Sequence, residues 1–406
     1  MTPSHAPPTA AYRDRNVLRW ATAYTASVSG DIVFFLTLSW AVTQVAGPAQ
    51  VGAVLAVGAV PRALLMLAGG VVADRYGPRR VVIGSDFARC VIIACAAALT
   101  QFTAGGLPVL YAVALVFGVI DALFMPAVGA LAGRLTDPGQ LGRVQGLRVL
   151  AVRVSNAVGP MIAAIVLAAA GVAAGFGLAG LLFSLSFGLL LAVRLNRGQT
   201  AEPSTGSPLD DLRAGLRYLW SNRQLARLVV VVGLSELCFS GPVGVGLVLL
   251  TSERQWGPAV LGWALSVFSI GGALTGVLLT ALPRVPRAGV VLIASLTATA
   301  VLVGALGQVT SAGALIVGAA ALGTISGTAM AIANALLQRS TEPSYLGRVG
   351  SVTSLCTLGL SPLLYPLTGL VTAAWGTGVF FAGCALVCLL AALTAATARA
   401  IRRAEL

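Results

Sequence analysis

The sequence predicts an all-α membrane protein in which twelve transmembrane helices form two pseudo-repeated six-helix bundles. Three observations lead to this prediction: the composition, an internal repeat and the number of long apolar stretches. Of the 406 residues, 57% are hydrophobic and only 10% are charged, and the mean hydropathy is +0.92. Water-soluble domains of this length are much more polar, so the composition indicates helices that face lipid.

An internal repeat relates residues 134–144 (RLTDPGQLGRV) to residues 339–349 (RSTEPSYLGRV). Seven of the eleven positions are identical, and an eighth exchanges Asp137 for Glu342. The offset of 205 residues is half the chain, which indicates a duplicated unit. The same offset makes Asp31 and Glu236 equivalent positions of the repeat, and both acids lie in apolar stretches. Parallel repeats with an ionisable group at equivalent depth are typical of secondary transporters.

A membrane-spanning helix needs about 20 apolar residues. Stretches of this kind cover residues 17–46, 51–73, 82–103, 107–131, 145–170, 175–195, 227–250, 259–282, 288–308, 312–337, 349–371 and 375–398. They define five parts of the chain. These are a cytoplasmic tail (1–16), an N-terminal bundle (17–195), a cytoplasmic linker with an amphipathic surface helix (196–226), a C-terminal bundle (227–398) and a second cytoplasmic tail (399–406).

The arginines predict the orientation in the membrane. All 26 basic residues are arginine, and most of them lie in or beside every second connection between the apolar stretches. The other set of connections contains only Arg254. Because cytoplasmic loops carry the excess of basic residues, both termini and the linker are expected in the cytoplasm, with the protein in the plasma (inner) membrane. The net charge of +13 is therefore attributed to topology, and no nucleic-acid partner is expected.

Charged residues inside the apolar stretches are the candidate functional groups, because charge in hydrocarbon is costly unless it faces a cavity or a partner. Five lie well inside: Asp31, Arg62, Asp121, Arg153 and Glu236. Counting residues from the cytoplasmic ends of their helices places Asp31 and Arg62 at equal depth, about 18 Å from those ends. We therefore expect an Asp31–Arg62 pair and a second pair between Asp121 and Arg153.

Asp86 and Arg89 are assigned to the cytoplasmic start of the third apolar stretch. Two further predictions concern coupling to protons. Glu236 has no basic residue at its depth, and an unpaired carboxyl in a medium of low dielectric constant resists ionising. Glu236 is thus expected to be the principal proton-responsive group, while Asp31 stays ionised beside Arg62. The only histidine, His5, lies in the tail, so carboxylates must do any proton coupling.

One connection resembles a known family signature. Residues 70–80 (GVVADRYGPRR), which follow the second apolar stretch, resemble the G-x-x-x-D-R-x-G-R-[RK] loop of the major facilitator superfamily and depart from it only at Pro78. The resemblance implies two six-helix bundles with a central cavity between them. It also implies that the loop is a conformational latch, formed here by Gly70, Asp74, Arg75, Gly77, Arg79 and Arg80.

Narrower features are similar to the drug-efflux branch of that family, near the macrolide exporters and the actinobacterial transmembrane secretion effectors. These features are Gly30-Asp31, Pro61-Arg62, residues 121–127 (DALFMPA), and the antiporter-like Gly159-Pro160. The resemblance implies export of amphipathic small molecules, such as drugs or antibiotics, in exchange for protons. The span-4 arginine of many proton antiporters is missing, and Arg62 and Arg153 are its candidate replacements.

Other functions remain as alternatives. An uptake symporter or facilitator for a small metabolite would have the same architecture. The five buried charges sum to −1, which favours cationic or neutral cargo. An intramembrane protease using Asp31 and Asp121 would need a G-x-G-D element, and the chain has Val28-Ser29-Gly30-Asp31 instead. We expect no enzyme activity, no cofactor, no metal and no ATP, because no nucleotide-binding loop is found, and we expect a monomer.

Overall fold

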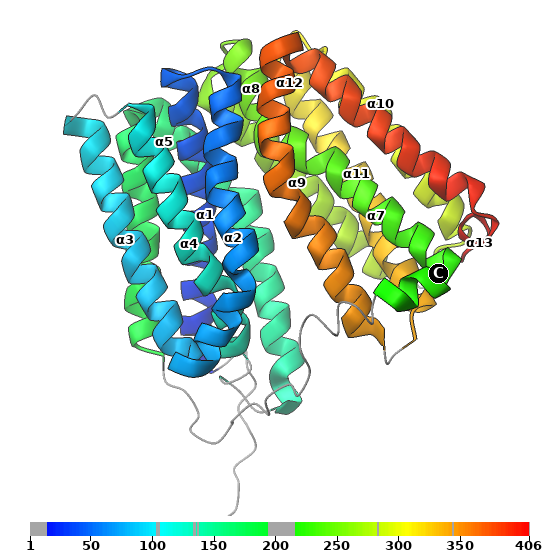
Figure 1. Cartoon of the computed structure of the whole chain (residues 1–406), viewed down its shortest axis with the longest axis horizontal. Helices are drawn as coiled ribbons and strands as arrows, with labels where there is room; N and C mark the ends of the chain where they lie inside the picture. Colours follow the sequence, from blue (N-terminus) through cyan, green and yellow to red (C-terminus); the bar gives the residue numbers. More distant parts are fainter. Residues whose placement is uncertain are drawn as a thin grey trace, which may run out of the picture. The chain divides into compact units, whose positions relative to one another are not determined.

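The computed structural model describes residues 14–102, 106–132, 135, 138–193, 216–281, 284–342 and 345–405. Regular structure in these ranges is entirely helical (Figure 1). The elements are α1 (Arg15–Val45), α2 (Pro48–Tyr76), α3 (Pro78–Phe102), α4 (Leu107–Ala132), η1 (Pro138–Gln140), α5 (Leu141–Leu191), α7 (Arg223–Gly241), η2 (Pro242–Gly246), α8 (Leu247–Glu253), α9 (Gly257–Ala281), α10 (Ala288–Leu306), α11 (Ala312–Ser340), α12 (Leu346–Thr397) and α13 (Arg399–Arg402).

Ten helices in the described ranges are long and apolar enough to cross a membrane. Two of them, α5 and α12, contain 51 and 52 residues. An α-helix of 51 residues is about 77 Å long, more than twice the thickness of a hydrocarbon core. Each is interrupted by a glycine with left-handed φ, Gly171 (φ 76°) in α5 and Gly376 (φ 84°) in α12. The sequence predicts connections between spans at residues 171–174, which include Gly171, and at residues 372–374, just before Gly376.

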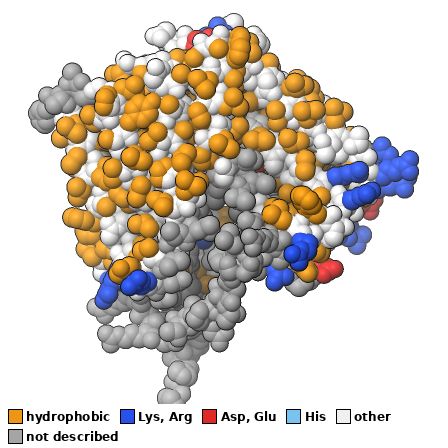
Figure 2. All heavy atoms as spheres, in the orientation of Figure 1, with side chains coloured by type: hydrophobic (Ala, Val, Ile, Leu, Met, Phe, Trp, Pro, Cys, Tyr) orange, Lys and Arg blue, Asp and Glu red, His pale blue; other side chains and the backbone are white. Residues whose placement is uncertain are grey.

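The outer faces of the helices are apolar. Figure 2 shows hydrophobic side chains spread along the helices, whereas arginines gather near helix ends, for example around α13. Large aliphatic side chains such as Leu181 (70% exposed), Val277 (69%) and Leu278 (64%) project outward. Aliphatic surface on this scale is unfavourable in water but is matched to lipid.

The chain divides into two compact units, residues 1–41 with 57–203, and residues 42–56 with 204–406. In the first unit, α3 packs against α4 and α5. In the second, α11 packs against α9 and α10, and α12 packs against α7 and α10. The short stretch around the α1–α2 connection is grouped with the second unit, although the sequence places it in the N-terminal bundle.

The second copy of the repeat holds two neighbouring segments in place. The ring of Tyr218, in a helical segment over residues 216–221, stacks on Tyr345 with centroids 4.1 Å apart. The Tyr218 hydroxyl accepts a hydrogen bond from the Glu342 amide at 3.4 Å, and Arg339 Nη1 donates to the Glu405 carbonyl at 2.8 Å. Residues 194–215, with most of the linker and the start of its expected surface helix, lie outside the described ranges, as do residues 134, 136 and 137 of the first copy.

Candidate functional site

Five charged side chains from four helices meet inside the first unit: Asp31 of α1, Arg62 of α2, Asp86 and Arg89 of α3, and Asp121 of α4. We call these five residues the ionic cluster. The side chains of Asp86 and Arg89 are fully buried and that of Asp121 is 1% exposed, whereas those of Asp31 and Arg62 are 19% and 32% exposed. The desolvation of buried charges must be offset by close partners, so the contacts within the cluster indicate what each group can do.

Arg89 is the centre of the ionic cluster. Its Nη1 donates to Ser27 Oγ at 3.1 Å and to Asp86 Oδ1 at 3.3 Å, and its Nη2 donates to Asp121 Oδ1. Nη1 also lies 3.8 Å from Asp31 Oδ1. The planar guanidinium fork allows one side chain to meet three carboxylates, which a lysine ammonium could not do with the same geometry.

Aromatic side chains enclose Arg89. Its guanidinium carbon lies 3.9 Å from the ring centroid of Phe124, 5.2 Å from that of Phe183 and 5.4 Å from that of Phe117. The faces of aromatic rings attract a cation, and this attraction increases when water is excluded. Arg89 is therefore held as a permanent positive charge in the interior of the unit.

Two of the three carboxylates have a cation within hydrogen-bond distance. Asp86 accepts hydrogen bonds from the hydroxyls of Ser27 (3.2 Å) and Ser186, in addition to the bond from Arg89. Asp121 lies between two arginines, since its Oδ2 is 2.8 Å from Arg62 Nε and its Oδ1 accepts from Arg89. Both carboxylates thus have close cationic partners.

Asp31 is the carboxylate with the weakest support. Its Oδ1 is buried and has no hydrogen-bond partner in the described part of the chain, and the Arg89 guanidinium 3.8 Å away is beyond hydrogen-bond distance. With all groups ionised, the ionic cluster carries three negative and two positive charges. One bound proton or one cationic ligand would neutralise the excess charge, and Asp31 is the partly exposed carboxylate that can receive it.

The structure pairs the charged residues differently from the sequence predictions. Arg62 pairs with Asp121 and not with Asp31. Arg153 is exposed on α5 and forms no ion pair within the described ranges, so the expected Asp121–Arg153 pair is not formed. The reason is Arg89, whose side chain takes the place next to both Asp31 and Asp121.

The assignment of Asp86 and Arg89 to the start of the third span was wrong. Helix α3 begins at Pro78. Arg89 is therefore about 16 Å along the helix, close to the depth expected for Asp31. The i, i+3 spacing of Asp86 and Arg89 places both side chains on one face of α3, and this spacing was the sequence signal that could have identified them.

Glu236 lies on α7, in the second unit, and is half-buried. No hydrogen bond or ion pair joins it to another residue in the described part of the chain. Its surroundings therefore differ from those of Asp31, which lies among other charges.

The Gly159-Pro160 element is buried in α5 and packs on α1 beside the ionic cluster. A Cβ at Gly159 would lie 3.2 Å from Ile32 Cγ2, next to Asp31 in sequence. One turn earlier, Ser155 Oγ accepts a hydrogen bond from Ser29 Oγ at 3.0 Å and donates to the Thr25 carbonyl at 3.1 Å. The element thus fixes the distance between α5 and the face of α1 that carries the acid.

The signature loop connects α2 to α3 through Gly77, whose φ of 84° is readily accessible only to glycine. Arg79 Nη2 donates to the Leu191 carbonyl at 3.0 Å, and Arg19 Nη1 donates to the Ala192 carbonyl at 3.5 Å. Cations are favourable at a helix C-terminus, where carbonyl groups lack intrahelical partners. The loop is therefore tied to the end of α5.

The other residues of the signature have different surroundings. Gly70 is half-buried, and Arg75 and Arg80 are exposed. The side chain of Asp74 lies outside the described part of the structure.

We predict that Arg79→Ala lowers the free energy of unfolding by about 1 kcal/mol, because it removes the hydrogen bond to the last turn of α5. Thermal unfolding of the purified protein in detergent measures the effect. Arg80→Ala, a change at the adjacent exposed arginine, is the matched control. Equal unfolding temperatures for the two variants would show that the contact with Leu191 adds no stability.

Comparisons with known proteins agree with this architecture. Residues 20–250 match the Major Facilitator Superfamily. The chain is 28% identical over 404 residues to the multidrug efflux pump Tap of Mycobacterium tuberculosis, covering 94% of this chain and 92% of that protein. It is 26% identical over 294 residues to the enterobactin exporter EntS of Shigella boydii, covering 71% of this chain and 68% of that protein.

Solved transporter structures share the fold at low sequence identity. A bacterial homologue of the iron transporter ferroportin in an inward-facing state superimposes with a TM-score of 0.68 at 19% identity, over 94% of this chain and 98% of that one. The nucleoside transporter NupG gives a TM-score of 0.71 at 13% identity, over 94% and 100%. Since the family match also extends over more than half of the chain, this multi-pass membrane protein belongs to the major facilitator superfamily.

Proposed function

We propose that the protein is a secondary active exporter of amphipathic small molecules, that it is driven by exchange for protons, and that the ionic cluster is its coupling centre. The observation that carries the proposal is the excess carboxylate of the cluster, together with the unsatisfied Oδ1 of Asp31. Export is favoured over uptake because two relatives of the chain, with 28% and 26% identity, are named as an efflux pump and an exporter.

In the proposed cycle Asp31 carries the proton. When Asp31 is protonated, two carboxylates balance two guanidiniums, and the ionic cluster is neutral. When the proton leaves, one negative charge is left without a counterion in an apolar environment, which is costly. Water or a cationic group of the cargo can offset that cost, so proton and cargo compete for one carboxylate and their movements are coupled.

The other charged residues have supporting roles in the proposal. Arg89 is the fixed positive charge that Asp86 and Asp121 contact. Arg62 is the partly exposed partner of Asp121 and can contact the cargo. Glu236, the repeat equivalent of Asp31, is assigned a second cargo contact, because it is half-buried in the second unit and belongs to no cluster of charges among the described residues.

The remaining architecture is proposed as follows. The chain crosses the membrane twelve times, since the breaks at Gly171 and Gly376 each divide a long helix into two spans. Both termini and the linker are cytoplasmic. The Gly70–Arg80 loop acts as a conformational latch through Arg79, and the protein works as a monomer without ATP.

Expression in an efflux-deficient bacterial host tests the proposal. The wild-type chain is expected to raise the minimum inhibitory concentrations of several amphipathic drugs in a susceptibility panel, and Asp31→Asn, expressed at the same level, is expected to give none of this resistance. Equal resistance from both proteins would remove Asp31 from the mechanism. If no compound in the panel is affected by the wild-type chain, export of this drug class is contradicted.

A further inference from the structure

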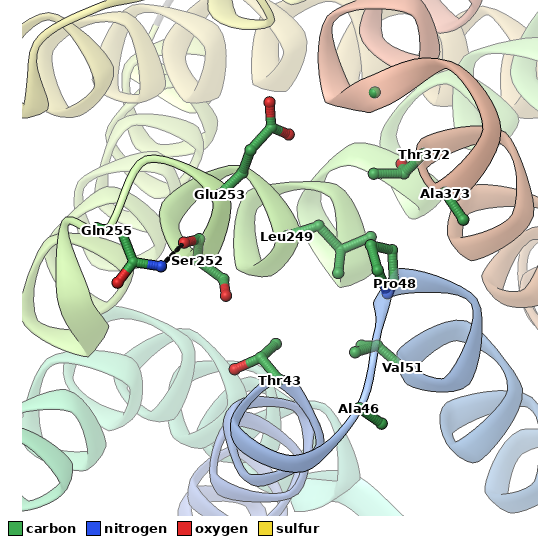
Figure 3. Close-up of a pocket in the computed structure, with 11 residues that line it drawn as sticks. Thr43, Ala46, Pro48, Val51, Leu249, Ser252, Glu253, Gln255, Thr372 and Ala373 are labelled. Carbon is green, nitrogen blue, oxygen red and sulfur yellow. Dashed lines mark hydrogen bonds between the residues drawn. The ribbon is translucent and has the colours of Figure 1, made fainter.

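A pocket of 540 Å³ lies in the second unit, and no residue of the ionic cluster lines it. Figure 3 shows Thr43, Leu249 and Ser252 around one open space, with Thr372 and Ala373 reaching it from α12. The helices contribute their ends: the C-terminal turn of α1, the start of α2, the end of α8 and the region of α12 that precedes Gly376. Pockets of this volume are typical of small-molecule sites.

Five of the eleven described residues that line this pocket are polar. Its lining includes the hydroxyls of Thr43, Ser252 and Thr372, the amide of Gln255 and the carboxylate of Glu253. Thr372 is 5% exposed, and its Oγ1 has no hydrogen-bond partner among the described residues. A buried hydroxyl without a partner costs free energy, so a ligand atom that reaches Thr372 would gain a hydrogen bond at a prepared position.

Glu253 is held in a defined position. Its Oε2 accepts hydrogen bonds from Thr377 Oγ1 at 2.7 Å and from the Thr377 amide at 3.4 Å. These bonds join the end of α8 to the first residues after Gly376 in α12. Thr377 thus holds Oε2, and no hydrogen bond to Oε1 is found among the described residues, so Oε1 is available to a ligand.

Close backbone contacts fix the walls of the pocket. A Cβ at Gly52 would lie 2.3 Å from the Tyr365 carbonyl oxygen, and one at Gly369 would lie 2.6 Å from the Pro48 carbonyl oxygen. The start of α2 therefore packs directly against α12, with no room for a side chain between them. A pocket with such walls keeps its lining residues in position before a ligand arrives.

We propose that this pocket binds an amphipathic organic cation, with its ammonium or iminium group beside Glu253 and its apolar part against Leu249 and Val51. Among the described residues that line the pocket, Glu253 is the one with a charge, and the neighbouring Arg254 does not contribute to the lining. One carboxylate among hydroxyls and aliphatic carbons favours a cation that also carries apolar surface.

The placement of this site in the transport cycle depends on the function proposed above. The pocket lies at helix ends that belong to the arginine-poor set of connections, which are expected on the extracytoplasmic side. In that orientation the cation would occupy the pocket after it leaves the ionic cluster, and the pocket would be a release site.

Ethidium binding to the purified protein in detergent, followed by fluorescence anisotropy, tests the pocket directly. Glu253→Gln keeps an oxygen acceptor for Thr377 but removes the charge, and it is expected to raise the Kd about tenfold. Thr372→Val is expected to raise it about threefold through the loss of one hydrogen bond. Glu342→Gln, the same change at an exposed residue outside the pocket, is the matched control and should bind as the wild type does.

The outcomes separate this proposal from the proposed function. Wild-type affinity in both Glu253→Gln and Thr372→Val would overturn the pocket, and so would an absence of ethidium binding to the wild type. If Asp31→Asn weakens binding while Glu253→Gln does not, the ligand lies in the ionic cluster and the pocket is again rejected. Ethidium affinity that depends on Glu253, in a protein that gives no drug resistance in cells, would support the pocket and contradict export.

Discussion

Arg89→Leu is expected to abolish transport and to lower the free energy of unfolding by about 3–5 kcal/mol, the usual cost of breaking a buried ion pair from one side. The substitution leaves Asp86 and Asp121 with Arg62 as the one remaining cation of the ionic cluster. It also removes the cation from between the rings of Phe124 and Phe183. A leucine fills part of the space but can donate no hydrogen bond.

Thermal unfolding in detergent, followed by size-exclusion chromatography after heating, measures the loss of stability caused by Arg89→Leu. Arg80→Leu is the matched control, because Arg80 is an exposed arginine in the first turn of the same helix. Arg89→Lys keeps the charge but not the fork, so an intermediate stability is expected. If Arg89→Leu unfolds at the wild-type temperature, Arg89 is not the centre of the ionic cluster.

Asp31→Asn is expected to lose transport driven by protons as well, but to retain the stability of the fold. Removing this charge leaves two carboxylates and two guanidiniums, so the ionic cluster is neutral at all times. Since Asp31 Oδ1 receives no hydrogen bond, its amide substitute loses little, and the unfolding temperature should equal or exceed that of the wild type.

Control measurements for Asp31→Asn use another aspartate. Asp14 accepts a hydrogen bond from the Asn16 amide at the start of α1, and Asp14→Asn preserves that acceptor. This variant should transport and unfold as the wild type does. A large loss of stability in Asp31→Asn would indicate that the carboxylate has a structural role in the ionic cluster.

Much of the helical architecture could be predicted from the sequence, because the length and spacing of apolar stretches limit where a chain can cross a bilayer. Predicted spans 1 and 10, residues 17–46 and 312–337, correspond to α1 (Arg15–Val45) and α11 (Ala312–Ser340). The predicted connections near Gly171 and Gly376 fall inside long helices. The non-helical glycines Gly171 and Gly376 interrupt both helices at these places.

The ionic cluster could be predicted only in part. Counting residues from the loops identified Asp31, Arg62 and Asp121 as deep charges, and the structure brings these three together. It did not identify Arg89, because the basic signature loop ends only nine residues before it and the charge was attributed to the helix end. Pairing depends on which face of each helix is turned inward, and the apolar pattern of a helix that is buried on several sides does not define that face.

The central claim is that Asp31 couples export to protons, and a pH-gradient experiment in proteoliposomes tests it most directly. Ethidium transport under an imposed pH gradient is compared with ethidium counterflow without a gradient, for the wild type, Asp31→Asn and Glu236→Gln. The account predicts that Asp31→Asn loses gradient-driven transport but retains counterflow, which needs no net proton movement, and that Glu236→Gln keeps a response to the gradient. Loss of the gradient response in Glu236→Gln with a normal response in Asp31→Asn would contradict it and would make Glu236 the coupling carboxylate.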